Sequence, residues 1–179
     1  MKIESMEDLM VHELQDLRSA EEQLVEALPK MAAAANSPQL KKAFNDHLKQ
    51  TKTHLTRVEK ALQHMGKGPG NMKCKGMAGL VEEGEEAIKN VIDPETLDVA
   101  LIGAAQRVEH YEIAGYGTAR AHAQELGLNE IADLLQITLD EEGAADKLLT
   151  QLAEGAHDKW RERARDGPLR ATQWTRSAP

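Results

Sequence analysis

The segment AAQRVEHYEIAGYGTARAHAQELG, residues 104–127, decides the fold. Its apolar side chains recur at alternating steps of three and four residues, which is the spacing of one helix face packed against its neighbours. Carboxylates interrupt this stripe at its centre. The stripe consists of Ile102, Ala105, Glu109, Glu112, Tyr116, Ala119 and Ala123. The pattern predicts a long helix whose buried face is apolar at both ends and acidic in the middle.

Three further stretches show the same period, and helix breakers separate them. The breakers are Asn36-Ser37-Pro38, the run GKGPGN at 66–71, Asp93-Pro94 and Gly127. Proline and glycine end helices, whereas the stretches between them are rich in helix formers. We predict an all-α fold with helices at 5–35, 38–65, 95–126 and 128–155, and a short helix at 76–90. Two hairpins joined by the long crossover 66–94 form the ferritin-like variant of a four-helix bundle.

The two predicted hairpins resemble each other at a constant offset. The breakers Asn36 and Gly127 differ by 127 − 36 = 91 residues. Similar side chains obey the same offset in the pairs Glu21 and Glu112, Leu40 and Ile131, Phe44 and Leu135, Leu48 and Leu139, and Val58 and Leu149. This repeat predicts a pseudo-twofold axis that places equivalent residues opposite each other in the middle of the bundle.

The charge distribution divides the chain into an acidic body and a basic end. The net charge is −8, and residues 156–179 carry six basic and three acidic side chains, or +3, which leaves −11 for the rest. An acidic body argues against a nucleic-acid partner. We expect residues 1–156 to form the bundle and residues 157–179 to be a basic, irregular tail.

Composition also indicates the compartment. The single cysteine, Cys74, excludes an internal disulfide and fits a reducing environment. No basic and apolar leader opens the chain, and no apolar run approaches the roughly 20 residues of a membrane span. We therefore expect a cytoplasmic protein with no membrane partner.

Polar residues occupy the centres of all four predicted stripes at a similar depth. They are Glu21, His47, Thr51, His54, Glu109, Glu112 and Glu142. A buried, ionised carboxylate costs several kcal/mol unless something compensates it, and neighbouring carboxylates repel. A metal ion relieves both problems, and carboxylate with imidazole ligands suits iron, manganese or zinc. The alternative is that each glutamate lies at a wet margin or pairs with a cation, as Glu109 can with Arg107.

The sequence resembles a known group of proteins. The segments HELQDLRSAEEQLVEALPKM (12–31), residues 104–127 and LDEEGAADKL (139–148) are similar to the YciF/YciE-type ferritin-like stress proteins, and the similarity extends over about 5–155. The resemblance implies a ferritin-like fold, a homodimer and a role in bacterial stress responses. It defines no biochemical activity.

Ferritin-like carboxylate proteins use one Glu from each of two helices and a Glu-x-x-His from each of the other two. By this resemblance Glu21, Glu112 and Glu142 match ligand glutamates and His54 matches a ligand histidine. Glu109 resembles the additional glutamate of rubrerythrin-like members.

Two positions depart from that pattern. Thr51 stands where a glutamate is expected and Ala145 where a histidine is expected. Asp146 can replace the missing histidine, Glu109 can supply the missing charge, and His47 can also reach the site. The predicted metal ligands are Glu21, His54, Glu109, Glu112, Glu142 and Asp146.

Two functions remain open at this stage. The first is a metal-binding stress protein that holds iron, in a mononuclear or di-iron site, and reacts with a small oxidant such as a peroxide. The second is a non-catalytic, dimeric structural protein whose metal site is vestigial.

Overall fold

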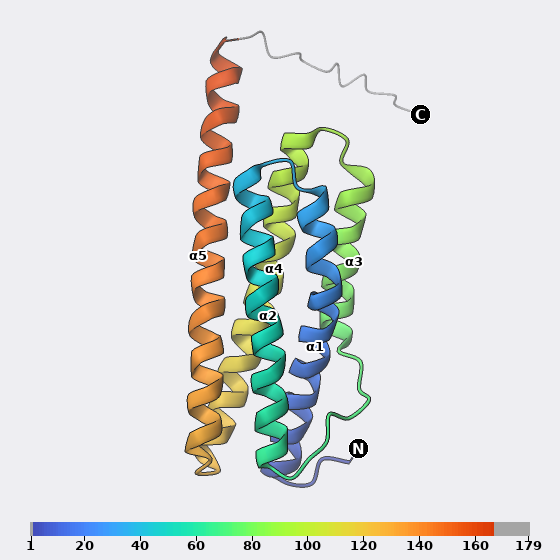
Figure 1. Ribbon diagram of the computed structural model, residues 1–179, viewed down its shortest axis with the longest axis vertical. Coiled ribbons are helices and arrows are strands. Elements are labelled where there is room, and N and C mark those ends of the chain that lie inside the picture. The colour runs from blue at the N-terminus through green and yellow to red at the C-terminus, as the bar shows by residue number, and fades with distance from the viewer. Residues whose placement is uncertain (1, 167–179) are drawn as a thin grey trace, which may run out of the picture.

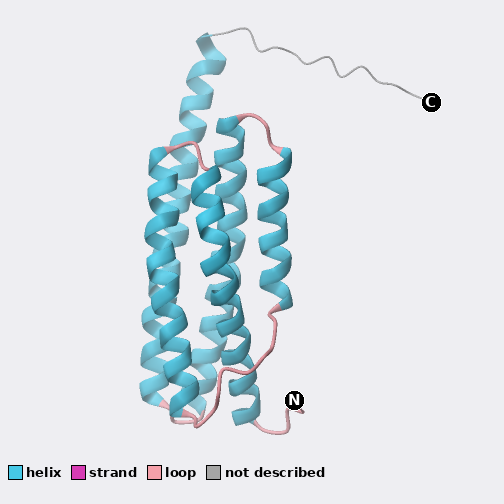
Figure 2. Cartoon of the chain, turned by 45° about the vertical axis from the view of Figure 1, so that its right-hand side comes forward, coloured by secondary structure: helices cyan, strands magenta, loops and turns pink. Residues whose placement is uncertain are grey.

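The computed structural model describes the backbone of residues 2–166 and the side chains of residues 2–156. Within these residues every regular element is a helix and no strand is present (Figure 2). The helices are α1 (Met6–Ala34), α2 (Pro38–His64), α3 (Lys75–Asn90), α4 (Pro94–Glu125) and α5 (Asn129–Asp166). No helix in this described part has the length and apolarity that crossing a membrane requires.

The helices form two antiparallel hairpins with a helix-containing crossover between them (Figure 1). The first hairpin is α1 with α2 and the second is α4 with α5, and α3 packs against α1 and α4. The predicted all-α, ferritin-like bundle is confirmed, as is the short helix in the crossover.

Capping side chains start the helices close to the predicted positions. Ser37 accepts a hydrogen bond from the backbone N–H of Leu40, and Pro38 occupies the first turn, where its missing N–H is not needed. The buried carboxylate of Asp98 on α4 accepts the backbone N–H groups of Asn36 and Ser37, at 2.7 and 2.8 Å. The α1–α2 turn is thereby fastened to the second hairpin.

The end of α5 differs from our prediction. We expected the last helix to stop at residue 155 and an irregular tail to begin at 157, but α5 continues to Asp166 (Figure 1). The stretch HDKWRERARD, residues 157–166, lacks an apolar period but also lacks proline and glycine, and its Lys, Arg and Glu favour helix. Residues 167–179 of the predicted tail lie outside the described residues, so the division into bundle and tail stays a prediction.

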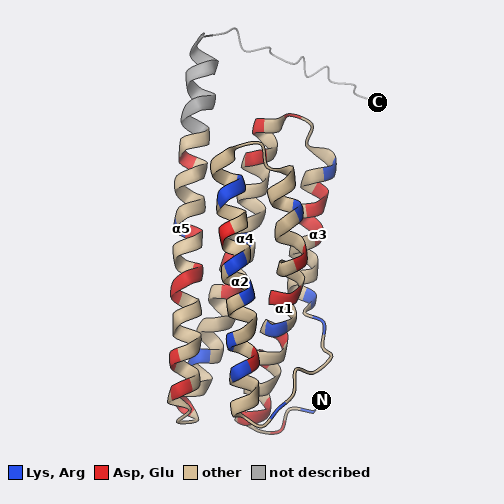
Figure 3. Ribbon diagram, in the orientation of Figure 1, with Lys and Arg blue, Asp and Glu red and all other residues tan. Residues whose placement is uncertain are grey.

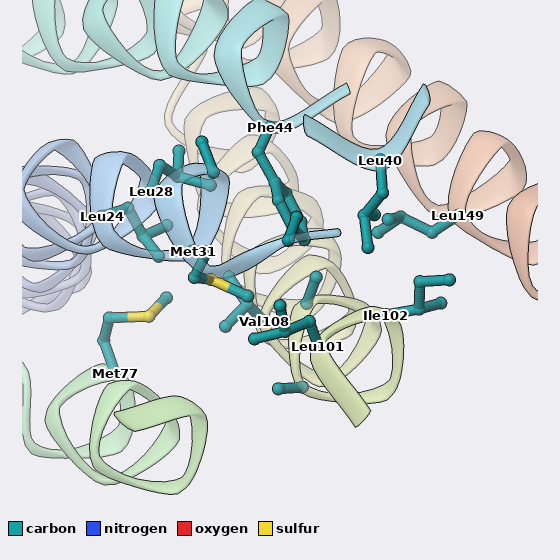
Figure 4. Close-up of a cluster of buried hydrophobic side chains, with 14 of the residues drawn as sticks. Leu24, Leu28, Met31, Leu40, Phe44, Met77, Leu101, Ile102, Val108 and Leu149 are labelled. Atoms are coloured by element: carbon teal, nitrogen blue, oxygen red, sulfur yellow. The ribbon is translucent and has the colours of Figure 1, made fainter. Parts of the chain in front are cut away.

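Two apolar clusters fill the bundle, one toward each end. We call the first the α3-side cluster; its largest members include Leu24, Leu28, Met31, Leu40, Phe44, Met77, Leu101 and Ile102 (Figure 4). We call the second the N-terminal cluster; its members include Met10, Leu14, Leu17, Val58, Leu62, Tyr116, Ile131 and Leu135. Leu40 and Phe44 of the first cluster and Ile131 and Leu135 of the second are buried, as the 91-residue repeat predicts.

Candidate metal centre

A buried polar level separates the two apolar clusters. Along α2, Phe44 belongs to the α3-side cluster and Val58 to the N-terminal cluster, and the polar residues lie between them. On α1, α4 and α5 polar residues likewise lie between side chains of the two clusters. The residues of this level are Glu21 on α1; His47, Thr51 and His54 on α2; Glu109 and Glu112 on α4; and Thr138 and Glu142 on α5. Each is less than a tenth exposed, which excludes the wet-margin alternative for the glutamates.

The first group of side chains joins α1, α2 and α5. It consists of Glu21, His54 and Glu142, all with no measurable exposure. Nδ1 of His54 lies 2.8 Å from Oε1 of Glu142 and 3.6 Å from Oε1 of Glu21. One imidazole nitrogen therefore points between two carboxylates.

The second group joins α2, α4 and α5. It consists of His47, Glu109, Glu112 and Glu142. Nε2 of His47 lies 3.3 Å from Oε1 of Glu109 and 3.8 Å from Oε2 of Glu142. The two groups thus share Glu142, with one of its oxygens near each histidine.

The spacing of the donor atoms fits a metal ion. Within each group one donor atom per residue can be chosen so that all lie within 4.8 Å of one another. Imidazole and carboxylate ligands bind such ions at about 2.0–2.2 Å, so two ligands on opposite sides of an ion are about 4–4.4 Å apart. Small side-chain rotations would bring either group to coordinating distance.

Several donor atoms of this level lack well-aligned hydrogen bonds within the described residues. They are both oxygens of Glu112 and Glu142, Oε2 of Glu21, Oε2 of Glu109, both ring nitrogens of His47 and Nδ1 of His54. Buried polar atoms are ordinarily paired, because leaving one unpaired costs about 1–3 kcal/mol. So many incompletely paired acceptors at one level indicate a site shaped for cations.

Burial controls the protonation of the carboxyl groups. It raises the pKa of Glu21 to about 8 and, together with the neighbouring carboxylates, raises the pKa values of Glu109 and Glu112 well above 4.5. Burial also opposes ionisation of Glu142, but the hydrogen bond and charge of His54 outweigh it, so the pKa of Glu142 is lowered. Without a metal ion, one ionised glutamate therefore lies among protonated ones.

His47 and His54 differ in charge for related reasons. Burial lowers the pKa of His47, which favours the neutral ring. Burial also acts to lower the pKa of His54, but contacts with Glu142, Glu21 and Glu141 reverse this and raise it. His54 and Glu142 consequently form a buried ion pair.

The structure brings five of the six predicted ligands together. Asp146 is the exception, because its carboxylate lies 3.2 Å from Nε2 of Gln106 and 3.4 Å from Nε2 of His110, outside both groups. His47, which we named as a side chain able to reach the site, lies in the second donor group instead. The cation suggested as a partner for Glu109, Arg107, pairs with Glu83.

The two departures from the ferritin-like pattern are compensated elsewhere. The Thr51 hydroxyl donates to the backbone carbonyl of His47 at 3.0 Å and offers no ligand. Glu109 on α4 supplies the carboxylate that α2 lacks, and His47 on α2 supplies the imidazole that α5 lacks at Ala145. The set again has four carboxylates and two imidazoles, the number that ferritin-like dinuclear sites use. The number of donors thus equals that of the ferritin-like pattern, although two of them lie on different helices.

Two contacts around this level were not predicted from the sequence. The Tyr116 hydroxyl donates a hydrogen bond to Oε1 of Glu21. Oε2 of Glu141 lies 2.8 Å from Nε2 of His54, and Arg57 in turn holds Glu141. Tyr116 was visible as a stripe residue one turn after Glu112, but Glu141 lies off the stripe and carried no signal.

Comparison with known proteins identifies the family of this chain. Residues 5–161 match the family described as a domain of unknown function, DUF892. The chain belongs to this family. Protein YciF of Escherichia coli strain K12 is 44% identical over 154 residues, which is 86% of this chain and 93% of YciF.

Solved structures place the DUF892 chain among ferritin-like folds. The crystal structure of the E. coli stress protein YciF superposes with a TM-score of 0.85 at 42% identity, over 88% of this chain and 99% of that one. The YcfI protein of Rhodopseudomonas palustris, provisionally described as a structural protein, gives 0.81 at 39% identity, over 83% and 95%. Ferritin-like diiron-carboxylate proteins of Bacillus anthracis give 0.67 at 15% identity, over 84% and 99%, a likeness of fold alone.

Proposed function

We propose that this DUF892 protein binds a pair of transition-metal ions, with iron as the preferred metal, between its helices. One ion is held by Glu21, His54 and Glu142, and the other by His47, Glu109, Glu112 and the same Glu142. The observation that carries the proposal is the pair of buried donor groups that share one carboxylate. Manganese and zinc accept the same ligands.

The residues around this level support redox chemistry with a small oxidant. Bound iron would supply a Lewis-acidic, redox-active centre to which dioxygen or a peroxide could bind. The apolar clusters on both sides exclude bulk water from the level. The Tyr116 hydroxyl donates a hydrogen bond to Oε1 of Glu21, and the protonated carboxyls give up protons when cations enter. Since its relative YciF is a stress protein, we propose that this chemistry serves stress protection in the cytoplasm.

Metal content after native purification tests the proposal. We expect about two ions per chain after loading with Fe(II) or Mn(II), as in ferritin-like dinuclear sites. The variant Glu142→Gln should weaken uptake of both ions by more than about a hundredfold, because even residues behind the ligands contribute ten- to a hundredfold. Asp140→Asn, an equal change of charge at an exposed site on α5, should leave uptake unchanged. Less than about a tenth of an ion per chain, with no uptake of added metal, would disprove metal binding.

A second function is favoured by the Thr51 and Ala145 departures. In that case the protein is a dimeric structural protein and the polar level is a remnant whose carboxyls are protonated or salt-bridged. We propose a homodimer under either function, and the exposed apolar residues Ile137 and Leu148 share one face of α5, three turns apart. Sedimentation tests the dimer. If the polar level is only a remnant, melting curves should not change when Fe(II) or Mn(II) is added. A ligand that binds the folded protein at a hundred times its Kd would instead stabilise the fold by about 2.7 kcal/mol.

A further inference from the structure

His54 is held on both sides of its ring, unlike His47. Its Nδ1 faces Glu142 and Glu21, and its Nε2 lies 2.8 Å from Oε2 of Glu141. Neither ring nitrogen of His47 has a well-aligned hydrogen bond within the described residues. The carboxylate of Glu141 against Nε2 therefore orients the His54 ring before a metal arrives.

Glu141 is in turn held by an arginine. Arg57, one turn after His54 on α2, donates from Nη1 to Oε2 of Glu141 and from Nη2 to Oε1 at 3.2 Å. Nη1 also lies 3.2 Å from the hydroxyl of buried Thr138 on α5. The guanidinium is thus bound to two residues of α5 and can hardly rotate away. A two-point contact between guanidinium and carboxylate is strong and directional.

These residues lie where a basic helix meets an acidic one. Figure 3 shows several Lys and Arg positions along α2 and several Asp and Glu positions along α5. Glu141 and Glu142 are adjacent on α5, so their side chains point about 100° apart, one toward the α2 boundary and one into the bundle. Glu141 is 31% exposed and Glu142 is fully buried.

We propose that Glu141, held by Arg57, is a positioning residue that fixes His54 with Nδ1 toward the metal. The inference rests on the proposed function. A histidine that binds metal through one nitrogen nearly always donates the N–H of the other to a carboxylate, a carbonyl or water. Here Glu141 accepts from Nε2, which leaves Nδ1 as the ligand atom. Glu141 itself would touch no metal.

Metal binding by full-length protein tests this role, with Zn²⁺ and Mn²⁺ as probes in calorimetric titrations. Glu141→Leu removes the acceptor and should weaken one of the two binding events by about ten- to a hundredfold, leaving the other unchanged. Glu141→Gln keeps an acceptor oxygen without the charge and should lose less metal affinity than Glu141→Leu. Asp140→Asn makes the same charge change at the neighbouring position, on an exposed side chain that accepts a hydrogen bond from Gln136, and should bind metal like the parent protein.

A spectroscopic measurement separates positioning from general loosening of the fold. In the Zn²⁺-loaded parent protein, nitrogen-15 spectra of histidine should show His54 with its proton on Nε2 and the metal on Nδ1. In Glu141→Leu this proton signal should broaden or shift, while the His47 signals stay. Melting curves of the metal-free variants show whether each one folds. If Glu141→Leu does not fold, the same spectra are compared between Glu141→Gln and the parent protein.

Three outcomes would overturn the inference, and they are distinguishable. If the parent protein binds neither Zn²⁺ nor Mn²⁺, the proposed function fails and Glu141 has no ligand to position. If the parent protein binds metal and Glu141→Leu binds it equally tightly at both positions, the positioning role alone fails. Equal weakening of both binding events would also contradict it, because it would indicate a change in the whole bundle.

Discussion

The apolar clusters and the polar level are equally buried but have opposite effects on stability. Leu40 and Phe44 lie at 1% and 2% exposure in the α3-side cluster, and Glu21 and Glu112 lie at 0% between the clusters. Burial of the former removes hydrocarbon from water and stabilises the fold. Burial of the latter removes carboxyl groups from water with incomplete hydrogen bonding and destabilises it. The ends of the bundle therefore hold together a centre that, without a ligand, works against folding.

The largest expected expression of this contrast is the pH dependence of stability. The folded pKa of Glu21 is about 8 against an ordinary 4.5, and those of Glu109 and Glu112 are also raised. Above pH 4.5 the unfolded chain ionises while the folded chain keeps its protons, so metal-free protein loses stability as pH rises toward 8. Each pKa unit corresponds to about 1.4 kcal/mol, so the loss should reach several kcal/mol.

Other titrating groups oppose or assist this trend in known directions, and the lowered pKa of His47 opposes it, because it costs stability below about pH 6.5. The raised pKa of His54 adds stability below about pH 6.5 that is lost as pH rises, in the same sense as the glutamates. The lowered pKa of Glu142 has the opposite sign, adding stability above 4.5. Urea unfolding at a series of pH values measures the sum. Metal-loaded protein should show the reverse slope, since ligands must lose protons to bind, and parallel slopes with and without metal would contradict the proposal.

A truncation in an apolar cluster measures the stabilising side of the comparison. Phe44→Ala should cost about 3–5 kcal/mol of unfolding free energy, because it removes a buried ring and leaves a cavity. The loss should be present at every pH and with or without metal. Ile92→Ala, at a residue 94% exposed, is the matched control and should change stability by less than about 0.5 kcal/mol. Chemical denaturation of both variants checks the difference.

A substitution in the polar level should have the opposite sign. Glu112→Leu replaces a buried carboxyl whose oxygens lack well-aligned hydrogen bonds with a side chain of similar size. We expect the metal-free protein to gain about 1–3 kcal/mol and to lose most of its stabilisation by added Fe(II) or Mn(II). Glu82→Leu, at an exposed position of α3, should do neither. If Glu112→Leu destabilised the metal-free protein, the carboxyl would be a structural element and the contrast between centre and ends would fail.

The same contrast explains which features the sequence could predict. Stripes of Leu, Ile and Phe at helical spacing gave the hairpins and both clusters, because any apolar residue at these positions must be buried. Glu21, Glu109, Glu112 and Glu142 were predicted because they lie on those stripes, and on a stripe burial follows from the period alone. Periodicity thus located the level of the site.

Which donor completes the site was not predictable from the period. Asp146 follows Glu142 by one turn, yet it lies beside the stripe and meets Gln106. His47 lies on the stripe, but the family pattern places no ligand there. Glu141 and Arg57 carried no signal in the sequence, and only the structure shows Nε2 of His54 against Glu141. These assignments depend on how neighbouring helices are rotated, which a single helix period does not contain.

The smallest expected effect concerns Tyr116, which touches both regions. Its ring packs in the N-terminal cluster and its hydroxyl donates to Oε1 of Glu21 in the polar level. Tyr116→Phe keeps the packing and removes one hydrogen bond, so metal-free protein should lose about 0.5–1.5 kcal/mol. Tyr111→Phe is the control on the same helix, because its hydroxyl donates to Asp16 and lies against Cys74, at 2.8 and 2.9 Å, outside the donor groups.

The two tyrosine variants differ in how metal changes their effect. Tyr111→Phe should lower the unfolding free energy equally with and without Mn²⁺, because its partners bind no ion. Tyr116→Phe should have a different cost in the two states, since Glu21 exchanges a hydrogen bond for a metal bond only in the loaded protein. Denaturation curves of both variants, each with and without Mn²⁺, measure these costs in unfolding free energy. If metal left the Tyr116→Phe cost unchanged while binding was intact, Oε1 of Glu21 would not be a ligand atom, and Oε2 would be the one oxygen that Glu21 could offer to the three-residue group.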